Sequence, residues 1–119
     1  MLRMFIWKRW VMSTTPDYIE FVLDQIDNKW NKRSKKMFGE YMIYVNEKPI
    51  LLVCNNTVYV KELDCIKTLF PKENKGFPYK GAKEHYIVDV EDKELFNNII
   101  DELERVIPLP VKKPGKSGQ

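Results

Sequence analysis

The sequence has few of the residues on which metal centres, disulfide frameworks and common catalytic motifs depend. It contains one histidine and two cysteines among 119 residues. A zinc site needs several closely spaced cysteine or histidine ligands, and one histidine with no close pair of cysteines does not provide them. The sequence therefore excludes a zinc site. Cys54 and Cys65 indicate reduced thiols in a cytoplasmic protein, because no secretion signal precedes them. Phosphate-binding glycine loops, nucleophile elbows and paired-histidine metal helices are also missing, so the sequence predicts no cofactor and no enzyme of those classes.

A long apolar run is missing too. Crossing a bilayer takes about 20 apolar residues, so we expect no membrane span. The 44% hydrophobic fraction of this 14.2 kDa chain fits one globular domain. The net charge of +3 arises at the ends: residues 1–11 and 108–119 each carry cations only, whereas all 17 acidic residues lie between. The central segment is therefore slightly acidic, and attraction of the whole domain to nucleic acid is not expected.

Helix-start signals divide the chain after Met12. Thr15 suits a helix N-cap and Pro16 the first helical position. We therefore expect residues 1–11 to be an N-terminal extension, arising from an upstream start codon or forming a short tail. Residues 12–108 are expected to form a single domain. Residues 109–119 are rich in lysine, proline and glycine, which predicts a disordered basic tail.

Hydrophobic periodicity predicts helices before, within and after a set of strands. The first helix should run for roughly 15 residues from Pro16 and end in the cationic segment 29–36, since cations stabilise helix C-termini. Asn55-Asn56 predicts a tight hairpin turn, and Asp92 a cap for the last helix. The remaining expected elements are strands at 41–45, 50–54, 57–61 and 85–90, a short helix at 63–70 and a long loop at 71–83.

A single antiparallel sheet with helices on one face would bury all of these apolar stripes. The predicted fold is therefore a two-layer α+β domain. Its order is helix, three or four strands, helix, strand, helix.

Two lysine-rich segments are candidates for binding a partner. The first basic patch consists of Lys29, Lys32, Arg33, Lys35 and Lys36, with Lys61 added from the third expected strand. In the long loop, Lys72, Lys75, Lys80 and Lys83 are interleaved with Phe77 and Tyr79. Cations beside aromatic rings can contact phosphates and stack on bases. Such runs are also common on solvated surfaces, and both interpretations stay open.

His85 is the one histidine available for acid–base catalysis. A catalytic histidine needs an orienting acid and a nucleophile nearby. Glu84 is its neighbour in sequence, but neighbours on a strand point to opposite faces. An enzyme that uses His85 is therefore the weakest of the functional alternatives.

Three segments, in the same order, resemble a known family. Residues 37–44, MFGEYMIY, resemble the MFGGYGIY signature of the TfoX N-terminal domain family, named after a bacterial regulator of competence genes. Residues 51–61, LLVCNNTVYVK, and 77–86, FPYKGAKEHY, resemble two further segments of its short stand-alone members. The resemblance covers about residues 12–108. Glu40 and Met42 depart from it, standing where the family usually has glycines.

The resemblance implies an α+β fold similar to type III secretion chaperones. Its signature residues here are Met37, Phe38, Gly39, Tyr41, Tyr44 and Tyr59. We expect Gly39 to allow a tight turn between the first helix and the sheet, and the three tyrosines to pack as cross-strand neighbours. The candidate recognition loop consists of Phe77, Pro78, Tyr79, Lys80, Gly81 and Lys83, with Lys61 close by.

The leading hypothesis is a non-enzymatic regulatory or adaptor domain that binds protein partners, in competence or transcription regulation as the resemblance implies. Direct nucleic-acid binding through the basic clusters is the alternative. A homodimer formed by sheet or helix pairing is compatible with this fold class.

Overall fold

The computed structural model describes residues 14–37, 40–70 and 74–110. The predicted extension 1–11 and most of the predicted tail 109–119 lie outside this range, as do Phe38 and Gly39. No helix among the described residues is both long and apolar enough to cross a membrane.

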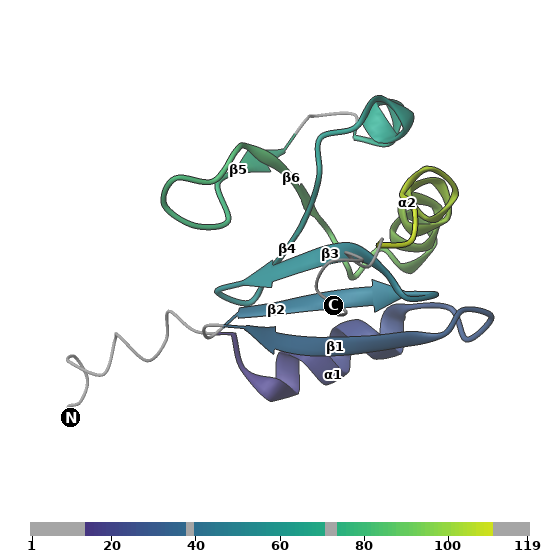
Figure 1. Ribbon diagram of the computed structural model, residues 1–119, viewed down its shortest axis with the longest axis horizontal. Helices are drawn as coiled ribbons and strands as arrows, with labels where there is room; N and C mark the ends of the chain where they lie inside the picture. The colour runs from purple at the N-terminus through teal and green to yellow at the C-terminus, as the bar shows by residue number, and fades with distance from the viewer. Residues whose placement is uncertain (1–13, 38–39, 71–73, 111–119) are drawn as a thin grey trace, which may run out of the picture.

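Two α-helices and one 3-10 helix accompany a six-stranded antiparallel sheet in the described part of the chain (Figure 1). The strand order is β1-β2-β3-β4-β6-β5. The elements are α1 (Pro16–Gln25), β1 (Lys32–Met37), β2 (Glu40–Val45), β3 (Lys48–Cys54), β4 (Thr57–Val60), η2 (Asp64–Leu69), β5 (Lys75–Gly76), β6 (His85–Val88) and α2 (Lys93–Val106). The predicted α+β fold is confirmed.

The predicted caps and hairpin are confirmed in detail. The Thr15 side chain accepts a hydrogen bond from the Tyr18 backbone N–H, with Pro16 in the first turn of α1. Asp92 caps α2 in the same way. Asn55 and Asn56 have φ values of 52° and 54°, as the two-residue turn between β3 and β4 requires. These signals succeed because each acts within a few residues.

The predicted length of the first helix is wrong. The helix α1 ends at Gln25, and the cationic segment that should have closed it contains strand β1 instead. All six β1 residues pair with β2, from Lys32 opposite Val45 to Met37 opposite Glu40. Lysine-rich segments have a low strand propensity, but they are common on edge strands, where charge discourages sheet-to-sheet aggregation. Pairing with the apolar strand β2 therefore overrides the local preference.

The core lies between the helices and one face of the sheet. Ile43 pairs with Leu51, and Val53 pairs with both Tyr41 and Val58, so these side chains share a face. The helices contribute further fully or almost fully buried side chains to the same core, namely Ile19, Val22, Phe96, Ile99, Ile100 and Leu103. Met42, Tyr44, Leu52, Tyr59 and Ile87 lie on the other face, by the same alternation.

The expectation that the three tyrosines pack as cross-strand neighbours is wrong. Tyr41 lies on the core face, whereas Tyr44 and Tyr59 lie on the opposite face. Tyr44 is stacked under the Arg33 guanidinium, 4.3 Å from ring centroid to Cζ. Tyr59 lies across from Leu52 and Ile87. An odd spacing of three residues places Tyr41 and Tyr44 on opposite faces of one strand.

Candidate functional site

The loop between β5 and β6 extends away from the rest of the domain (Figure 1, green, beside the β5 label). Its base is a short ladder in which Lys75 pairs with Tyr86 and Gly76 with His85. Phe77 and Tyr79 are 62% and 56% exposed, and they stand among the few large hydrophobic side chains exposed in the described residues. Pro78 between them is buried. The loop thus turns one side chain inward and two aromatic rings outward.

Backbone geometry explains the composition of this loop. The Ala82 N–H donates a hydrogen bond to the Tyr79 carbonyl, 3.1 Å from nitrogen to oxygen. This bond closes a four-residue turn whose third residue, Gly81, has a φ of +89°. A type II turn has positive φ at that position, which favours glycine. The turn holds Lys80 at its exposed corner, next to Tyr79.

A pocket of about 390 Å³ lies where the loop returns to the sheet. Lys61, directly after β4, and Lys83, two residues before the start of β6, both line it. The expected proximity of Lys61 to the recognition loop is therefore confirmed. Glu62 and Glu84 line the same pocket, so its charge is mixed rather than uniformly basic.

His85 lines this pocket, and the hydrogen-bond partner of its ring among the described residues is a backbone carbonyl rather than Glu62 or Glu84. Its Nδ1 lies 2.7 Å from the Lys83 carbonyl oxygen, which can only accept, so Nδ1–H is the donor. The ring meets Tyr59 edge-on, with centroids 6.5 Å apart. Burial raises the pKa of the Tyr59 phenol, so this hydroxyl stays protonated at neutral pH. The described residues that line the pocket include no serine, threonine or cysteine to serve as a nucleophile.

The first basic patch does not form one surface. Strand alternation places Lys32 on the core face of β1, and Arg33 and Lys35 on the other. Lys32 donates hydrogen bonds to the Ile26 carbonyl and the Asn28 side chain. Arg33 forms an ion pair with Glu47 at 2.9 Å. Lys61 follows β4, three strands away from β1, so the predicted grouping is corrected.

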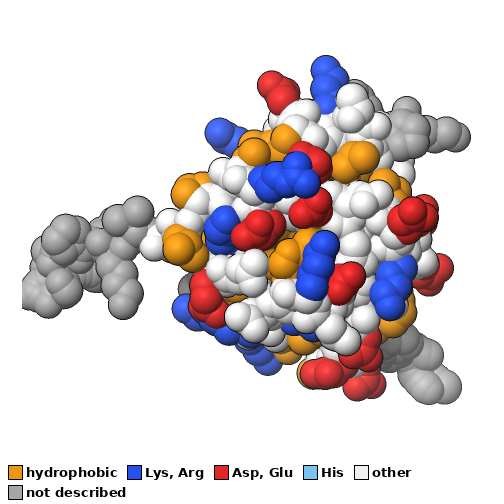
Figure 2. Space-filling model, turned by 90° about the vertical axis from the view of Figure 1, so that its right-hand side faces the viewer, with side chains coloured by type: hydrophobic (Ala, Val, Ile, Leu, Met, Phe, Trp, Pro, Cys, Tyr) orange, Lys and Arg blue, Asp and Glu red, His pale blue; other side chains and the backbone are white. Residues whose placement is uncertain are grey.

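Acidic and basic side chains are mixed on the side of the molecule where α2 lies. Figure 2 shows them interspersed, with no broad field of one sign on that side. Arg105, for example, lies within ion-pair distance of both Asp101 and Glu102. This surface gives a nucleic-acid backbone no continuous track of cations.

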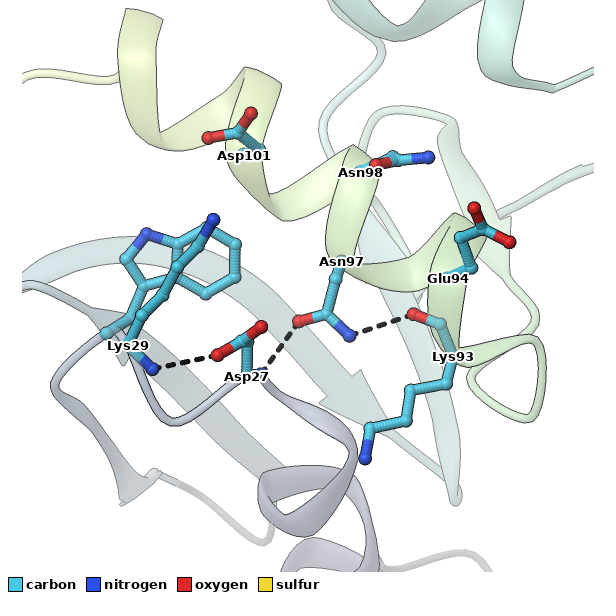
Figure 3. A pocket seen from close by; sticks show the side chains of 8 residues that line it. Asp27, Lys29, Lys93, Glu94, Asn97, Asn98 and Asp101 are labelled. Atoms are coloured by element: carbon cyan, nitrogen blue, oxygen red, sulfur yellow. Dashed lines mark hydrogen bonds between the residues drawn. The ribbon is translucent and has the colours of Figure 1, made fainter.

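Sequence reasoning missed a second pocket, of about 480 Å³, between the end of α1 and the start of α2 (Figure 3). Trp30 and Lys29 line one side, with the lysine Nζ 4.7 Å from the indole centroid. Asn97 lies at its centre. The Asn97 side chain accepts from the Asp27 N–H at 2.7 Å and donates to the carbonyls of Gln25, at 2.9 Å, and Lys93, at 2.8 Å.

This second pocket is held together by its own polar groups. The Asp27 carboxylate, for example, accepts a hydrogen bond from the Lys29 N–H. The Asn97 amide already has three partners within the protein, so the pocket joins two helices rather than presenting unpaired groups to a ligand. No local motif marks Asn97, because its partners Gln25 and Asp27 lie some 70 residues earlier. No group of three or more histidine, cysteine, aspartate or glutamate side chains in the described part could hold a metal ion.

Fold and loop together define a two-layer α+β domain with a protruding aromatic hairpin loop. No family model and no solved structure match the chain. It is 32% identical over 108 residues to the "uncharacterized 12.7 kDa protein in trpE 5′ region" of Spirochaeta aurantia. The match covers 89% of this chain and 94% of that protein. The chain therefore belongs to the same family.

Proposed function

We propose that the protein is a regulatory or adaptor domain that acts through protein–protein contacts, with the β5–β6 loop as its recognition element. The exposure of Phe77 and Tyr79 carries this proposal. Aromatic rings dominate the energetics of protein interfaces, because they bury a large area at a small cost in side-chain entropy. Two such rings on one protruding loop are suited to insertion into a partner's surface.

The loop also indicates the chemistry of the partner. Lys80 and Lys83 are exposed on the same loop as the two rings. An apolar pocket with acidic residues at its rim, on the surface of the partner, would match this combination of aromatic rings and lysines. The resemblance of residues 12–108 to the TfoX N-terminal domain family supports a regulatory role, with competence or transcription regulation as the process.

The first experiment is a tagged pull-down of the full chain from its native cell lysate, with and without nuclease. We expect a discrete protein partner that survives nuclease treatment. The Tyr79→Ala/Lys83→Ala variant should fold normally and lose this partner. Phe21→Ala is the matched control, because Phe21 is a 38% exposed aromatic side chain on α1 rather than on the loop. If the double variant keeps the partner, the loop is not the recognition element.

Direct nucleic-acid binding is the second candidate. It is favoured by the presence of exposed Lys80 and Lys83 on the same loop as two exposed rings, a combination that binds single strands by stacking and phosphate contact. Binding of a labelled single strand would be measured by fluorescence anisotropy at several salt concentrations. This candidate requires an affinity that falls steeply with salt and is lost in Phe77→Ala/Tyr79→Ala. Absent or salt-independent binding would eliminate it.

A further inference from the structure

Strand β1 is the outer strand at the edge of the sheet opposite β5, and its outward backbone groups can be identified from the pairing. The Asn46 N–H donates to the Asn31 carbonyl at 2.7 Å, next to the first residue pair of the β1–β2 ladder. In an antiparallel ladder, hydrogen-bonded and non-hydrogen-bonded pairs alternate. Arg33, Lys35 and Met37 therefore bond to β2, whereas Lys32, Ser34 and Lys36 direct their N–H and C=O groups away from the sheet.

These outward groups have no backbone partner in the described part of the chain. The sheet order ends at β1, and none of the turn, loop or cap hydrogen bonds uses the backbone of Lys32, Ser34 or Lys36. Each of the three can exchange both of its hydrogen bonds with an added antiparallel strand. An edge of this kind is the template for β-strand addition, in which an extended peptide extends an existing sheet.

The charges along this edge select the peptide. Lys32 and Arg33 are already engaged, with the Ile26 carbonyl and with Glu47 respectively. Lys35 and Lys36 are exposed, and no ion pair involves either of them within the described residues. Strand alternation places them on opposite faces of the sheet. An added strand would therefore meet one unpaired cation on each of its faces.

A second copy of the chain is a poor occupant of this edge. Antiparallel pairing of two β1 strands would align lysine and arginine with lysine and arginine, and like charges on neighbouring strands are destabilising. An extended segment with two adjacent acidic residues has the complementary pattern, one carboxylate toward each face.

We propose that the β1 edge is a second binding surface, which takes an extended, acidic peptide segment of a partner protein by β-strand addition. It lies across the sheet from the β5–β6 loop and does not depend on the function assigned to that loop. Main-chain hydrogen bonds to Lys32, Ser34 and Lys36 would hold the peptide, and Lys35 and Lys36 would select for acid.

The test uses three ten-residue peptides on one scaffold of valine and threonine, with Glu-Glu, Ser-Ser or Lys-Lys at the centre. Binding to the full chain is followed by NMR. The acidic peptide should bind about tenfold more tightly than the neutral one, and the basic peptide should bind the least. Amide exchange should slow at Lys32, Ser34 and Lys36 on binding. The amides of Arg33 and Lys35 already face β2 and serve as internal controls.

Ser34→Pro is the decisive variant. The Ser34 N–H points away from the sheet, and proline is tolerated where an edge-strand N–H faces outward. The variant should keep the fold, checked by circular dichroism, and weaken the acidic peptide by roughly tenfold. Ser34→Ala keeps the N–H and should bind as the wild type does, as should Tyr79→Ala. The Lys35→Glu/Lys36→Glu variant should reverse the preference, so that the basic peptide binds more tightly than the acidic one. This variant also tests the site if Ser34→Pro does not fold.

Three results would overturn the proposal. One is the absence of any binding of the acidic peptide at millimolar concentration. The lysines of β1 would then act only to discourage aggregation at the edge of the sheet. Another is undiminished binding to folded Ser34→Pro. The third is protection of the three outward amides that grows with protein concentration alone, since that would identify a second copy as the occupant.

Discussion

Asn97 allows the clearest test of how the two helices are held together. Its side chain accepts a hydrogen bond from the Asp27 N–H, just beyond α1 (Figure 3), and donates one to the carbonyl of Gln25, the last residue of α1. Replacement by alanine leaves these two groups without their partner. A typical hydrogen bond contributes about 0.5–1.5 kcal/mol to folding. The bonds to the Asp27 N–H and to the Lys93 carbonyl both lie on the exposed side, where water can replace them, so the part-buried bond to the Gln25 carbonyl carries most of the effect.

We therefore expect Asn97→Ala to lower the free energy of unfolding by about 1 kcal/mol. Asn98→Ala is the matched control, because Asn98 is the neighbouring exposed asparagine on the same helix. Both substitutions gain the higher helix propensity of alanine. The difference between them therefore isolates the bonds that Asn97 makes to α1, since a surface change such as Asn98→Ala shifts stability by about 0.5 kcal/mol or less.

The assay is urea denaturation of the full chain, followed by circular dichroism and by tryptophan fluorescence, to which Trp30 in the same pocket contributes. Thermal melting should give a consistent result, a Tm lower by roughly 4 °C at about 4 °C per kcal/mol for a domain of this size. If Asn97→Ala and Asn98→Ala unfold within 0.5 kcal/mol of each other, roughly the limit for surface changes, the hydrogen bonds do not join the helices as argued.

Two further predictions concern titratable groups. Burial, together with the nearby Glu40 carboxylate, raises the pKa of the Cys54 thiol to about 12. Alkylation at pH 8.5 should therefore modify the half-buried Cys65 first and reach Cys54 only on unfolding. Equal rates of modification of the two cysteines in a peptide-mapping time course would contradict this. Hydrogen bonds from Asn46 and Lys48 lower the pKa of Glu104, and a lowered folded-state pKa stabilises the fold above the ordinary value of 4.5. The urea midpoints of the wild type and Glu104→Gln should therefore differ at pH 7 and converge as the pH falls below 4.5 and through the lowered pKa of the folded state. A difference that stays constant with pH would show that ionisation of Glu104 does not contribute to stability.

Elements of this fold could be predicted where their cause is local. Thr15, Asn55-Asn56 and Asp92 each act through their own side chain or φ angle, and all three predictions hold. The strand β1 could not be found in this way. Its sequence, KRSKKM, has no strand preference, and it is a strand because β2 lies beside it in space.

The candidate site shows the same limit. The mixture of proline, glycine and aromatic residues predicted a loop around Phe77 and Tyr79, and the structure exposes both rings. Which side chains share a surface depends on strand alternation and sheet order, which composition does not reveal. The lysines around β1 were therefore grouped by sequence proximity, although Lys32 and Lys35 lie on opposite faces. Asn97 was missed because its role depends on a contact between distant helices.

The sheet order gives the adaptor hypothesis a physical basis. The order β1-β2-β3-β4-β6-β5 places the cationic edge and the aromatic loop at opposite ends of one hydrogen-bonded sheet, with four strands between β1 and β5. A ligand at one edge would therefore neither cover nor compete for the other. The two surfaces also select by different means, one by main-chain hydrogen bonds and acidic charge, the other by burial of aromatic rings. The domain could in this way hold two different proteins at a fixed separation.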